Sequence, residues 1–257
     1  MTRVVAIINQ KGGVGKTTTT VNLCHALAES GKKVTVIDFD PQGHLAVSFG
    51  IITQDISGID SVMLKEKTIE DVTVSVRKNL QLVPAGSKLK DVEHMSNHGS
   101  SRGILLRDSL RGQFDDQDFI FIDCPPSSGL LVANALIATD ELLIPMAGDF
   151  LALQGLSHLM ATVKRFEGAL KKRYKVSVVI SRFTSTRRIS GQILNVLLSH
   201  FPNQILATVI RETSLLAECP SFGQTILEYS PQSRSARDFR DLANDFLENR
   251  VMTNDNK

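Results

Sequence analysis

The chain has few of the residues that mark a secreted or membrane protein. Its 257 residues include no tryptophan, two tyrosines and three cysteines, and the cysteines form no Cys-x-x-Cys pair. This cysteine usage argues against a disulfide framework or a zinc site and favours a reducing compartment. No stretch approaches the ~18 apolar residues of a membrane-spanning helix, and the apolar run near the N-terminus is too short for a signal peptide. These absences predict a soluble intracellular protein with a mainly aliphatic core.

Charge is nearly balanced overall but is unevenly distributed along the chain. The net charge is +2, yet residues 161–190 carry nine basic side chains against one acid, Glu167, while the rest of the chain is net negative. Such asymmetry points to a polyanionic partner. A cationic helix that serves only solubility is the alternative. The basic residues of the segment are Lys164, Arg165, Lys171, Lys172, Arg173, Lys175, Arg182, Arg187 and Arg188.

A glycine-rich run at residues 11–18, Lys-Gly-Gly-Val-Gly-Lys-Thr-Thr, separates two apolar segments. Residues 4–8 before it have strand composition, and residues 21–28 after it have helical spacing. Strand, glycine-rich turn and helix together are the context that a phosphate-binding loop requires. Glycine lets backbone N–H groups close around phosphate, and the helix N-terminus adds partial positive charge. We expect Lys16 to reach the β- and γ-phosphates and the Thr17 hydroxyl to bind Mg²⁺.

Acidic residues follow two of the buried strands that the pattern predicts. Asp38 and Asp40 stand at the end of the run 33–38, and Asp123 ends the run 118–123. Ligands of α/β sheets bind outside the carboxyl ends of the strands, so these acids are expected near the phosphate loop. Asp123 is in the position of an acid that holds Mg²⁺, directly or through water. For Asp40, which precedes Pro41, simple turn chemistry is the alternative.

Strand-like and helical segments alternate along the whole chain. This order predicts an α/β fold with a mostly parallel sheet that is covered by helices on both faces. No internal repeat or linker divides the sequence, so residues 1–257 are expected to form one domain. Further strands are expected at 79–86, 141–145, 176–180 and 205–210, and further helices at 150–170, at 189–198 and near the C-terminus.

The phosphate loop departs from the standard pattern in a way that resembles a known family. The first glycine of the pattern falls on Gln10, and a second lysine, Lys11, follows it. Residues 11–17 resemble the deviant Walker A motif of the ParA/Soj/MinD ATPases. Residues 217–223 and 228–236 are similar to the Soj-like branch, so the resemblance covers essentially the whole chain. It implies a single-domain P-loop NTPase in which Lys11 reaches the partner subunit's nucleotide, although a merely solvated lysine is the alternative.

The same resemblance implies roles for individual residues. Asp40 would position or activate the attacking water. Where Soj-like proteins have Pro-Arg-Asn beside the adenine and DNA, this chain has Arg211, Glu212 and Thr213, and Thr186 replaces a DNA-contacting arginine. The expected catalytic residues are Lys11, Lys16 and Asp40; the nucleotide-binding residues Lys11, Gly12, Gly13, Val14, Gly15, Lys16, Thr17, Thr18, Arg211 and Thr213; the Mg²⁺ ligands Thr17, Asp123 and Asp40; and the DNA-binding residues Arg187, Arg188, Lys171, Lys172 and Arg173.

The function implied by the resemblance is an ATP-dependent dimerisation switch. Its ATP-bound homodimer would bind nucleoid DNA without sequence preference and position a plasmid, a chromosome or a protein body. An adaptor of ParB type, or a cargo-specific analogue, would stimulate hydrolysis, and the protein would be cytoplasmic and nucleoid-associated. A MinD-like membrane switch is the main alternative, but residues 249–257 are polar rather than cationic and amphipathic. The placement of Cys124 argues against an iron–sulfur ATPase, and no second catalytic constellation supports a metabolic enzyme.

Overall fold

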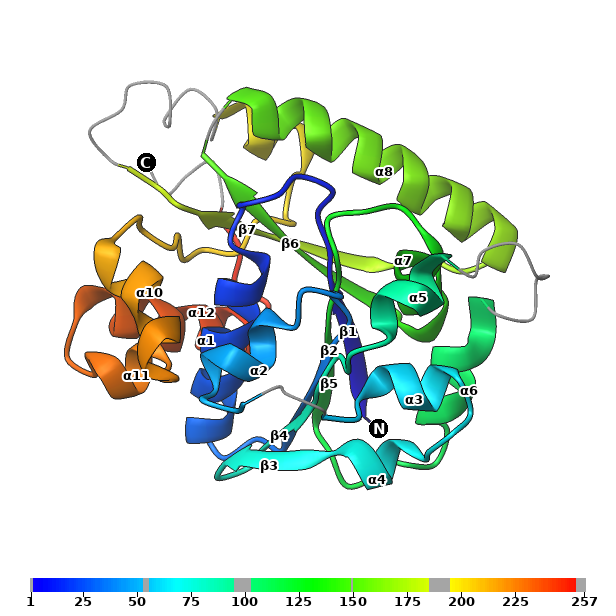
Figure 1. Ribbon diagram of the computed structural model, residues 1–257. Coiled ribbons are helices and arrows are strands. Elements are labelled where there is room, and N and C mark those ends of the chain that lie inside the picture. The colour runs from blue at the N-terminus through cyan, green and yellow to red at the C-terminus, as the bar shows by residue number, and fades with distance from the viewer. Residues whose placement is uncertain (1, 53–55, 95–102, 149, 185–194, 253–257) are drawn as a thin grey trace.

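The computed structural model describes residues 2–52, 56–94, 103–148, 150–184 and 195–252. Its centre is a seven-stranded sheet in the order β3-β4-β2-β5-β1-β6-β7 (Figure 1). Every pairing between neighbouring strands is parallel except β3–β4. The strands are β1 (Arg3–Ile7), β2 (Val34–Asp38), β3 (Val74–Arg77), β4 (Leu80–Val83), β5 (Phe119–Asp123), β6 (Glu141–Ala147) and β7 (Lys175–Ser181).

Helices cover both faces of the sheet, as the alternating pattern predicts. One apolar cluster joins the sheet to α1 and α12 through residues such as Leu27 and Phe239, and a second joins it to α7 and α8 through Leu136 and Leu159. The helices are α1 (Lys16–Glu29), α2 (His44–Ser48), α3 (Ile59–Met63), α4 (Ile69–Val72), α5 (Leu89–His94), α6 (Leu105–Leu110), α7 (Leu130–Ala138), α8 (Phe150–Leu170), α10 (Ser214–Glu218), the 3₁₀ helix η2 (Cys219–Phe222), α11 (Ile226–Tyr229) and α12 (Arg234–Glu248).

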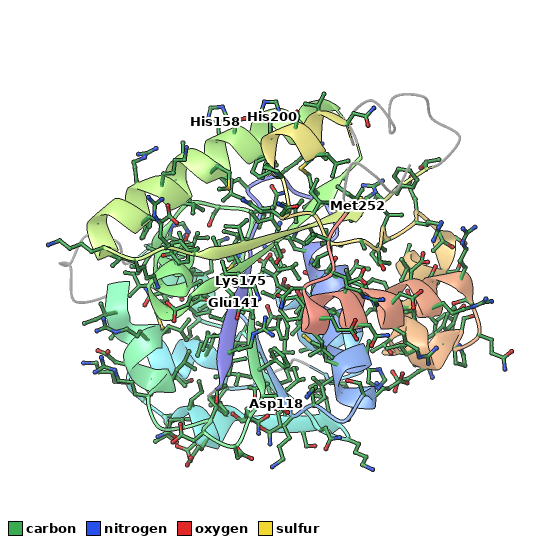
Figure 2. The ribbon with its side chains drawn as sticks, turned by 180° about the vertical axis from the view of Figure 1, so that it is seen from behind. Asp118, Glu141, His158, Lys175, His200 and Met252 are labelled. Atoms are coloured by element: carbon green, nitrogen blue, oxygen red, sulfur yellow. The ribbon has the colours of Figure 1, made fainter. Side chains whose placement is uncertain are left out.

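The central strands have the composition of a sheet that is buried on both faces. All five residues of β2 and all five of β5 are buried, which explains their nearly continuous apolar sequences. At the opposite end of the sheet from the phosphate loop, Glu141 accepts hydrogen bonds from Arg3 and lies 3.5 Å from Lys175 Nζ (Figure 2). These charges tie β1, β6 and β7 together where the strands begin.

Some elements differ from those expected. The antiparallel edge strand β3 and the short helices between residues 44 and 110 were not predicted. The segment 205–210 lies along β7 but does not form the regular strand that was expected. Ile205 makes an isolated bridge to Val178, and the Ile210 N–H donates to Ile180 O at 2.8 Å. Between these contacts, the Thr208 N–H donates to Asp245 Oδ2 at 2.7 Å. The expected helix at 189–198 is seen only from residue 195 onward, because residues 185–194 lie outside the described part. Among the described helices, none has the length and apolar character needed to span a membrane.

Candidate nucleotide-binding site

The phosphate loop connects the carboxyl end of β1 to the first residue of α1, as the sequence predicts. Two of its residues have left-handed backbones, Gly13 with φ 71° and Gly15 with φ 82°, and only glycine adopts these angles without strain. The turn delivers the chain directly into α1, which begins at Lys16. Exposed amides at a helix N-terminus form a ready site for a phosphate.

Lys16 is the cation of this loop and is only 7% exposed. Its Nζ donates to the backbone oxygen of Lys11 at 3.3 Å, so the side chain folds back across the loop. Burial lowers the pKa of Lys16, while the nearby carboxylates of Asp123 and Asp40 oppose that shift. A partly desolvated ammonium group interacts with a phosphate more strongly than an exposed one does.

Asp123 lies behind the loop at the end of β5, where two hydroxyl groups hold it. Thr17 Oγ1 donates to Asp123 Oδ2 at 2.7 Å, and Thr20 Oγ1 donates to Oδ1 at 2.8 Å. Burial nevertheless raises the pKa of Asp123 to about 6. Asp38 stands opposite Asp123 in the β2–β5 register, and burial together with the Asp123 charge raises its pKa well above the usual value. Buried carboxyl and hydroxyl oxygens in this arrangement are suitable ligands for Mg²⁺.

Asp40 lies on a short segment that Asp38 shapes. The two carboxylate oxygens of Asp38 accept the N–H groups of Asp40 at 3.2 Å and Leu45 at 3.1 Å. Asp40 in turn accepts the N–H of Gln42 at 3.0 Å and lines the same cavity as Lys16 and Thr17. The structure therefore brings Asp40 to the phosphate loop, while Asp38 supports the segment that carries it.

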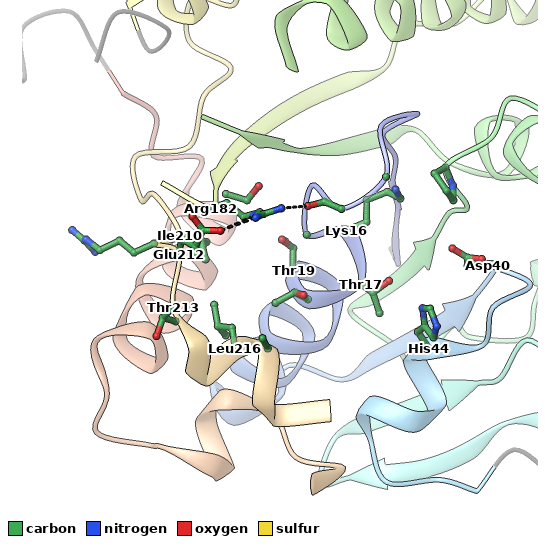
Figure 3. A pocket seen from close by; sticks show the side chains of 18 of the residues that line it. Lys16, Thr17, Thr19, Asp40, His44, Arg182, Ile210, Glu212, Thr213 and Leu216 are labelled. Carbon is green, nitrogen blue, oxygen red and sulfur yellow. Dashed lines mark hydrogen bonds and ion pairs between the residues drawn. The ribbon is translucent and has the colours of Figure 1, made fainter. Parts of the chain in front are cut away.

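A cavity of about 510 Å³ extends from Asp40 across the phosphate loop to α10 (Figure 3). Its far wall includes both residues expected beside the adenine, Arg211 and Thr213. The Arg211 guanidinium pairs with Asp238 Oδ1 at 2.6 Å, which restricts the positions it can take over a base. Thr213 caps α10 by accepting the Leu215 N–H at 3.4 Å. The cavity thus has a cationic phosphate end and a mixed apolar and polar end that suits a nucleoside.

Lys11 has a different place from Lys16. The described lining of the cavity includes Lys16 but not Lys11. The Lys11 N–H donates to Asn9 Oδ1 at 3.0 Å, and Asn9 Nδ2 donates to the oxygen of Pro145 at 2.8 Å. This contact anchors the first residue of the loop to the end of β6. Of the two lysines of the motif, only Lys16 is among the described residues that line the cavity.

The residues expected to bind DNA fall into two groups. Arg187 and Arg188 lie outside the described residues. The second group directly follows α8 and consists of Lys171, Lys172 and Arg173. It lies at the end of the sheet where β7 begins, opposite the end that carries the phosphate loop. Lys172 pairs with Asp140 at 3.2 Å, and Arg173 pairs with Glu167 at 3.0 Å. Acidic neighbours therefore offset part of the charge that the sequence shows in this segment.

Several residues at the site were not predicted. Thr20 holds Asp123, Asn9 anchors the loop, and Ser181 and Arg182 contact the loop from the end of β7. Arg182 also pairs with Glu212 at 2.7 Å. Glu212, which stands where Soj-like proteins are expected to have an arginine, therefore has a basic partner within the chain. The position of Ser181 at the carboxyl end of a buried strand is the signal that could have found it, because the same signal found Asp38 and Asp123.

Known proteins with similar sequences match nearly the whole chain. A family model described as "AAA domain" matches residues 2–176. The sporulation initiation inhibitor protein Soj of Bacillus subtilis is 36% identical over 252 residues, which cover 97% of this chain and 100% of that protein. The chromosome partitioning protein ParA of Myxococcus xanthus is 35% identical over 248 residues, covering 95% of this chain and 88% of that protein.

Solved structures agree with this relationship. A cobyrinic acid a,c-diamide synthase from Mycobacterium smegmatis, solved with a bound ATP analog and magnesium, superimposes with a TM-score of 0.84 at 27% identity. The match covers 98% of this chain and 100% of that one. The sequence relationship covers 95–97% of this chain and 88–100% of these partitioning proteins, and the family model spans the phosphate loop and Asp38, Asp40 and Asp123. The chain therefore belongs to the ParA/Soj family of P-loop ATPases.

Proposed function

We propose that residues 1–257 act as one ATPase domain whose ATP-bound form dimerises, binds DNA without sequence preference and positions a cargo. Hydrolysis, stimulated by an adaptor of ParB type or a cargo-specific analogue, returns the protein to a form that leaves the DNA. The protein would work in the cytoplasm on the nucleoid. Support comes from the full-length similarity to proteins named for chromosome partitioning and from the arrangement of the loop.

The presence of two lysines in one loop, of which only Lys16 is among the described residues that line the cavity, carries this proposal. Lys16 lines the cavity at the start of α1 and is the local phosphate ligand. Lys11 lies outside the described lining and is followed by the exposed turn Gly12–Gly13, so another subunit can approach it. A loop that serves one nucleotide alone needs no second lysine. We therefore assign Lys11 to the nucleotide of the partner.

Within one subunit the described contacts suggest how ATP and Mg²⁺ are held. The amides of residues 12–18 and Lys16 bind the phosphates, and Thr17 and Asp123 hold Mg²⁺, with Asp40 beside them. Bound Mg²⁺ neutralises phosphate charge and favours transfer of the terminal phosphoryl group to water. Asp40 orients the attacking water from its place in the cavity. Arg211 and Thr213 contact the base at the far wall.

The phosphate-loop assignment is tested with Lys16→Ala. The variant should lose ATP binding in calorimetry, because it removes the buried ammonium group at the start of α1, beside the amides that bind phosphate. Lys78→Ala provides the matched control, since Lys78 is exposed in the β3–β4 hairpin at the opposite end of the sheet. If Lys16→Ala binds ATP with the affinity of the wild type, the assignment of residues 11–18 as the phosphate loop is wrong.

The role of Lys11 is tested separately. Lys11→Ala should bind ATP with nearly wild-type affinity and yet remain a monomer in sedimentation with ATP and Mg²⁺. The wild type and Lys78→Ala should both dimerise under the same conditions. If Lys11→Ala also forms an ATP-dependent dimer, Lys11 has no role across the interface.

A further inference from the structure

The end of β7 carries an irregularity that brings two consecutive side chains to the phosphate loop. Ile210 N–H donates to Ile180 O at 2.8 Å, and Ile210 O accepts the Phe183 N–H at 3.0 Å. Ser181 and Arg182 therefore oppose the single residue Ile210, which is the arrangement of a β-bulge. Arg182 has a left-handed backbone with φ 50°, an uncommon conformation for a residue other than glycine.

This bulge changes the directions of the two side chains. Neighbouring residues of a regular strand point to opposite faces of the sheet. Here both side chains reach the same loop: Ser181 Oγ donates to Val14 O at 2.6 Å, and Arg182 Nη1 donates to Gly13 O at 3.0 Å. Glu212 Oε1 accepts from Nε at 3.1 Å and Nη2 at 2.7 Å of the same guanidinium, which fixes its orientation (Figure 3).

The contacts to two consecutive carbonyl groups also orient the amides behind them. In a planar trans peptide unit, the C=O of one residue and the N–H of the next point in opposite directions. Holding the Gly13 and Val14 oxygens against β7 thus directs the N–H groups of Val14 and Gly15 away from it. Neither of these amides donates to any part of the chain that the structure describes. Successive free N–H groups of this kind form an anion-binding concavity.

We infer that Ser181 and Arg182 are positioning residues that preorganise the Val14 and Gly15 amides for the phosphates of ATP. Both residues line the cavity, and their described contacts to the loop are made with its carbonyl groups, through which we infer that they act. The left-handed backbone of Arg182 is the conformation that allows its guanidinium to reach Gly13 directly after Ser181 has reached Val14. The inference rests on the proposed ATP binding at the loop, but it does not depend on dimerisation or on DNA.

Arg182→Gly separates this role from a role in the fold. Glycine adopts φ 50° freely, and the lost pair with Glu212 is largely exposed, at 54% and 39% for the two side chains, so folding stability should not fall. Affinity for ATP in the presence of Mg²⁺ should weaken by about tenfold, the size of one lost charge-assisted hydrogen bond. Lys65→Gly is the matched control, because Lys65 is an exposed cation with φ 62° after α3.

Calorimetry and thermal unfolding of the full chain give the result. A tenfold loss of affinity with a midpoint no lower than that of Lys65→Gly supports the inference. Affinity within twofold of the wild type overturns it. Weaker binding together with a clearly lower midpoint would show that Arg182 supports the fold, and this also overturns it.

Ser181 supplies a second, independent variant pair. Ser181→Ala removes the hydroxyl group that holds Val14, whereas Ser181→Thr keeps it, so only the alanine variant should bind ATP more weakly. Equal affinities for the two variants would overturn the role of the hydroxyl. Lys16→Ala is measured alongside: if it still binds ATP, the proposed site is wrong, whereas its failure combined with normal binding by Arg182→Gly refutes only the present inference.

Discussion

Asp123 illustrates, for a single residue, how burial and hydrogen bonding oppose each other. Two threonine hydroxyls donate to its oxygens and favour its charged form, yet burial raises its pKa to about 6. Asp38, its neighbour across the β2–β5 register, is shifted upward too. The charge of the buried Lys16 lowers the pKa of Asp123 and so offsets part of this shift. Two buried carboxyl groups beside one lysine favour additional positive charge, which the proposed Mg²⁺ would supply.

The proposed role of Asp40 in hydrolysis can be tested separately from nucleotide binding. Asp40→Ala should bind ATP and dimerise but release phosphate roughly 10²-fold more slowly, the lower end of the usual effect of losing a general base. Phosphate release under ATP saturation measures this. Asp241→Ala, on the exposed side of α12, is the control and should turn over normally. Wild-type turnover by Asp40→Ala would remove Asp40 from the water-positioning role.

His25 makes folding stability depend on pH. Its Nδ1 lies 2.7 Å from Thr225 Oγ1 inside the protein, and burial lowers its pKa below the usual 6.5. The unfolded chain therefore binds a proton near pH 6.5 that the folded chain still excludes. The contribution of neutral His25 is complete above pH 6.5 and is lost as the pH falls toward the folded pKa.

Urea unfolding at pH 7.5 and 5.5 tests this expectation. Asp123 and Asp38, whose pKa values burial raises, act in the opposite direction over this range, but they are common to both proteins. The change in free energy of unfolding from pH 7.5 to 5.5 should therefore be more favourable in His25→Gln than in the wild type. His200→Gln alters an exposed histidine and should keep the full wild-type pH dependence. An unchanged pH dependence in His25→Gln would show that other groups are responsible.

Among the elements, α1 and α8 provide a matched test of backbone conformation. Gly31 follows α1 with φ 91°, whereas Gly168 lies within α8, and a methyl group at either position would meet nothing within 4 Å. Gly31→Ala should lower the free energy of unfolding by about 1 kcal/mol, because the left-handed conformation is costly for alanine. Gly168→Ala should raise it by about 0.5–1 kcal/mol, because alanine favours the helix. Changes of equal sign in urea unfolding would contradict this reasoning.

Sequence patterns predicted the elements whose burial is continuous. Strands such as β2 and β5 are apolar throughout, and their terminal acids identified the edge of the sheet where the site lies. Residues 205–210 have the same composition, but the Thr208 amide pairs with Asp245 of α12 instead of a strand. The bulge at Ser181 and Arg182 depends on that distant segment as well. Neither feature has a local signal, because each is set by a partner far away in the chain.

At the scale of the whole molecule, the effect of the basic segment 161–190 depends on where its charged side chains lie and on which of them have acidic partners. Lys172 and Arg173 have acidic partners at one edge of the sheet. The proposed DNA contact consequently depends more on Arg187 and Arg188 than on the rest of the basic segment.

DNA retention with ATP, ADP and no nucleotide tests this division. The wild type should be retained only with ATP, and reversing both charges with Arg187→Glu and Arg188→Glu should abolish retention. Lys171→Glu with Arg173→Glu should have a smaller effect. If about four phosphates are contacted, log affinity should fall against log salt with a slope of roughly −3.6. Retention on anionic vesicles but not on DNA would instead favour the membrane alternative.

The contact between β7 and the phosphate loop also has a consequence while the protein is being synthesised on the ribosome. Ser181 is 167 residues beyond Val14, and Arg182 is 169 beyond Gly13. At about 5–20 residues per second, a ribosome needs roughly 10–30 seconds to connect these positions. During that interval the growing chain carries the complete motif without the side chains that hold it. We therefore expect ATP to bind a growing chain that lacks residues 181 and 182 more weakly, and to stabilise it less, than a chain in which these contacts have formed.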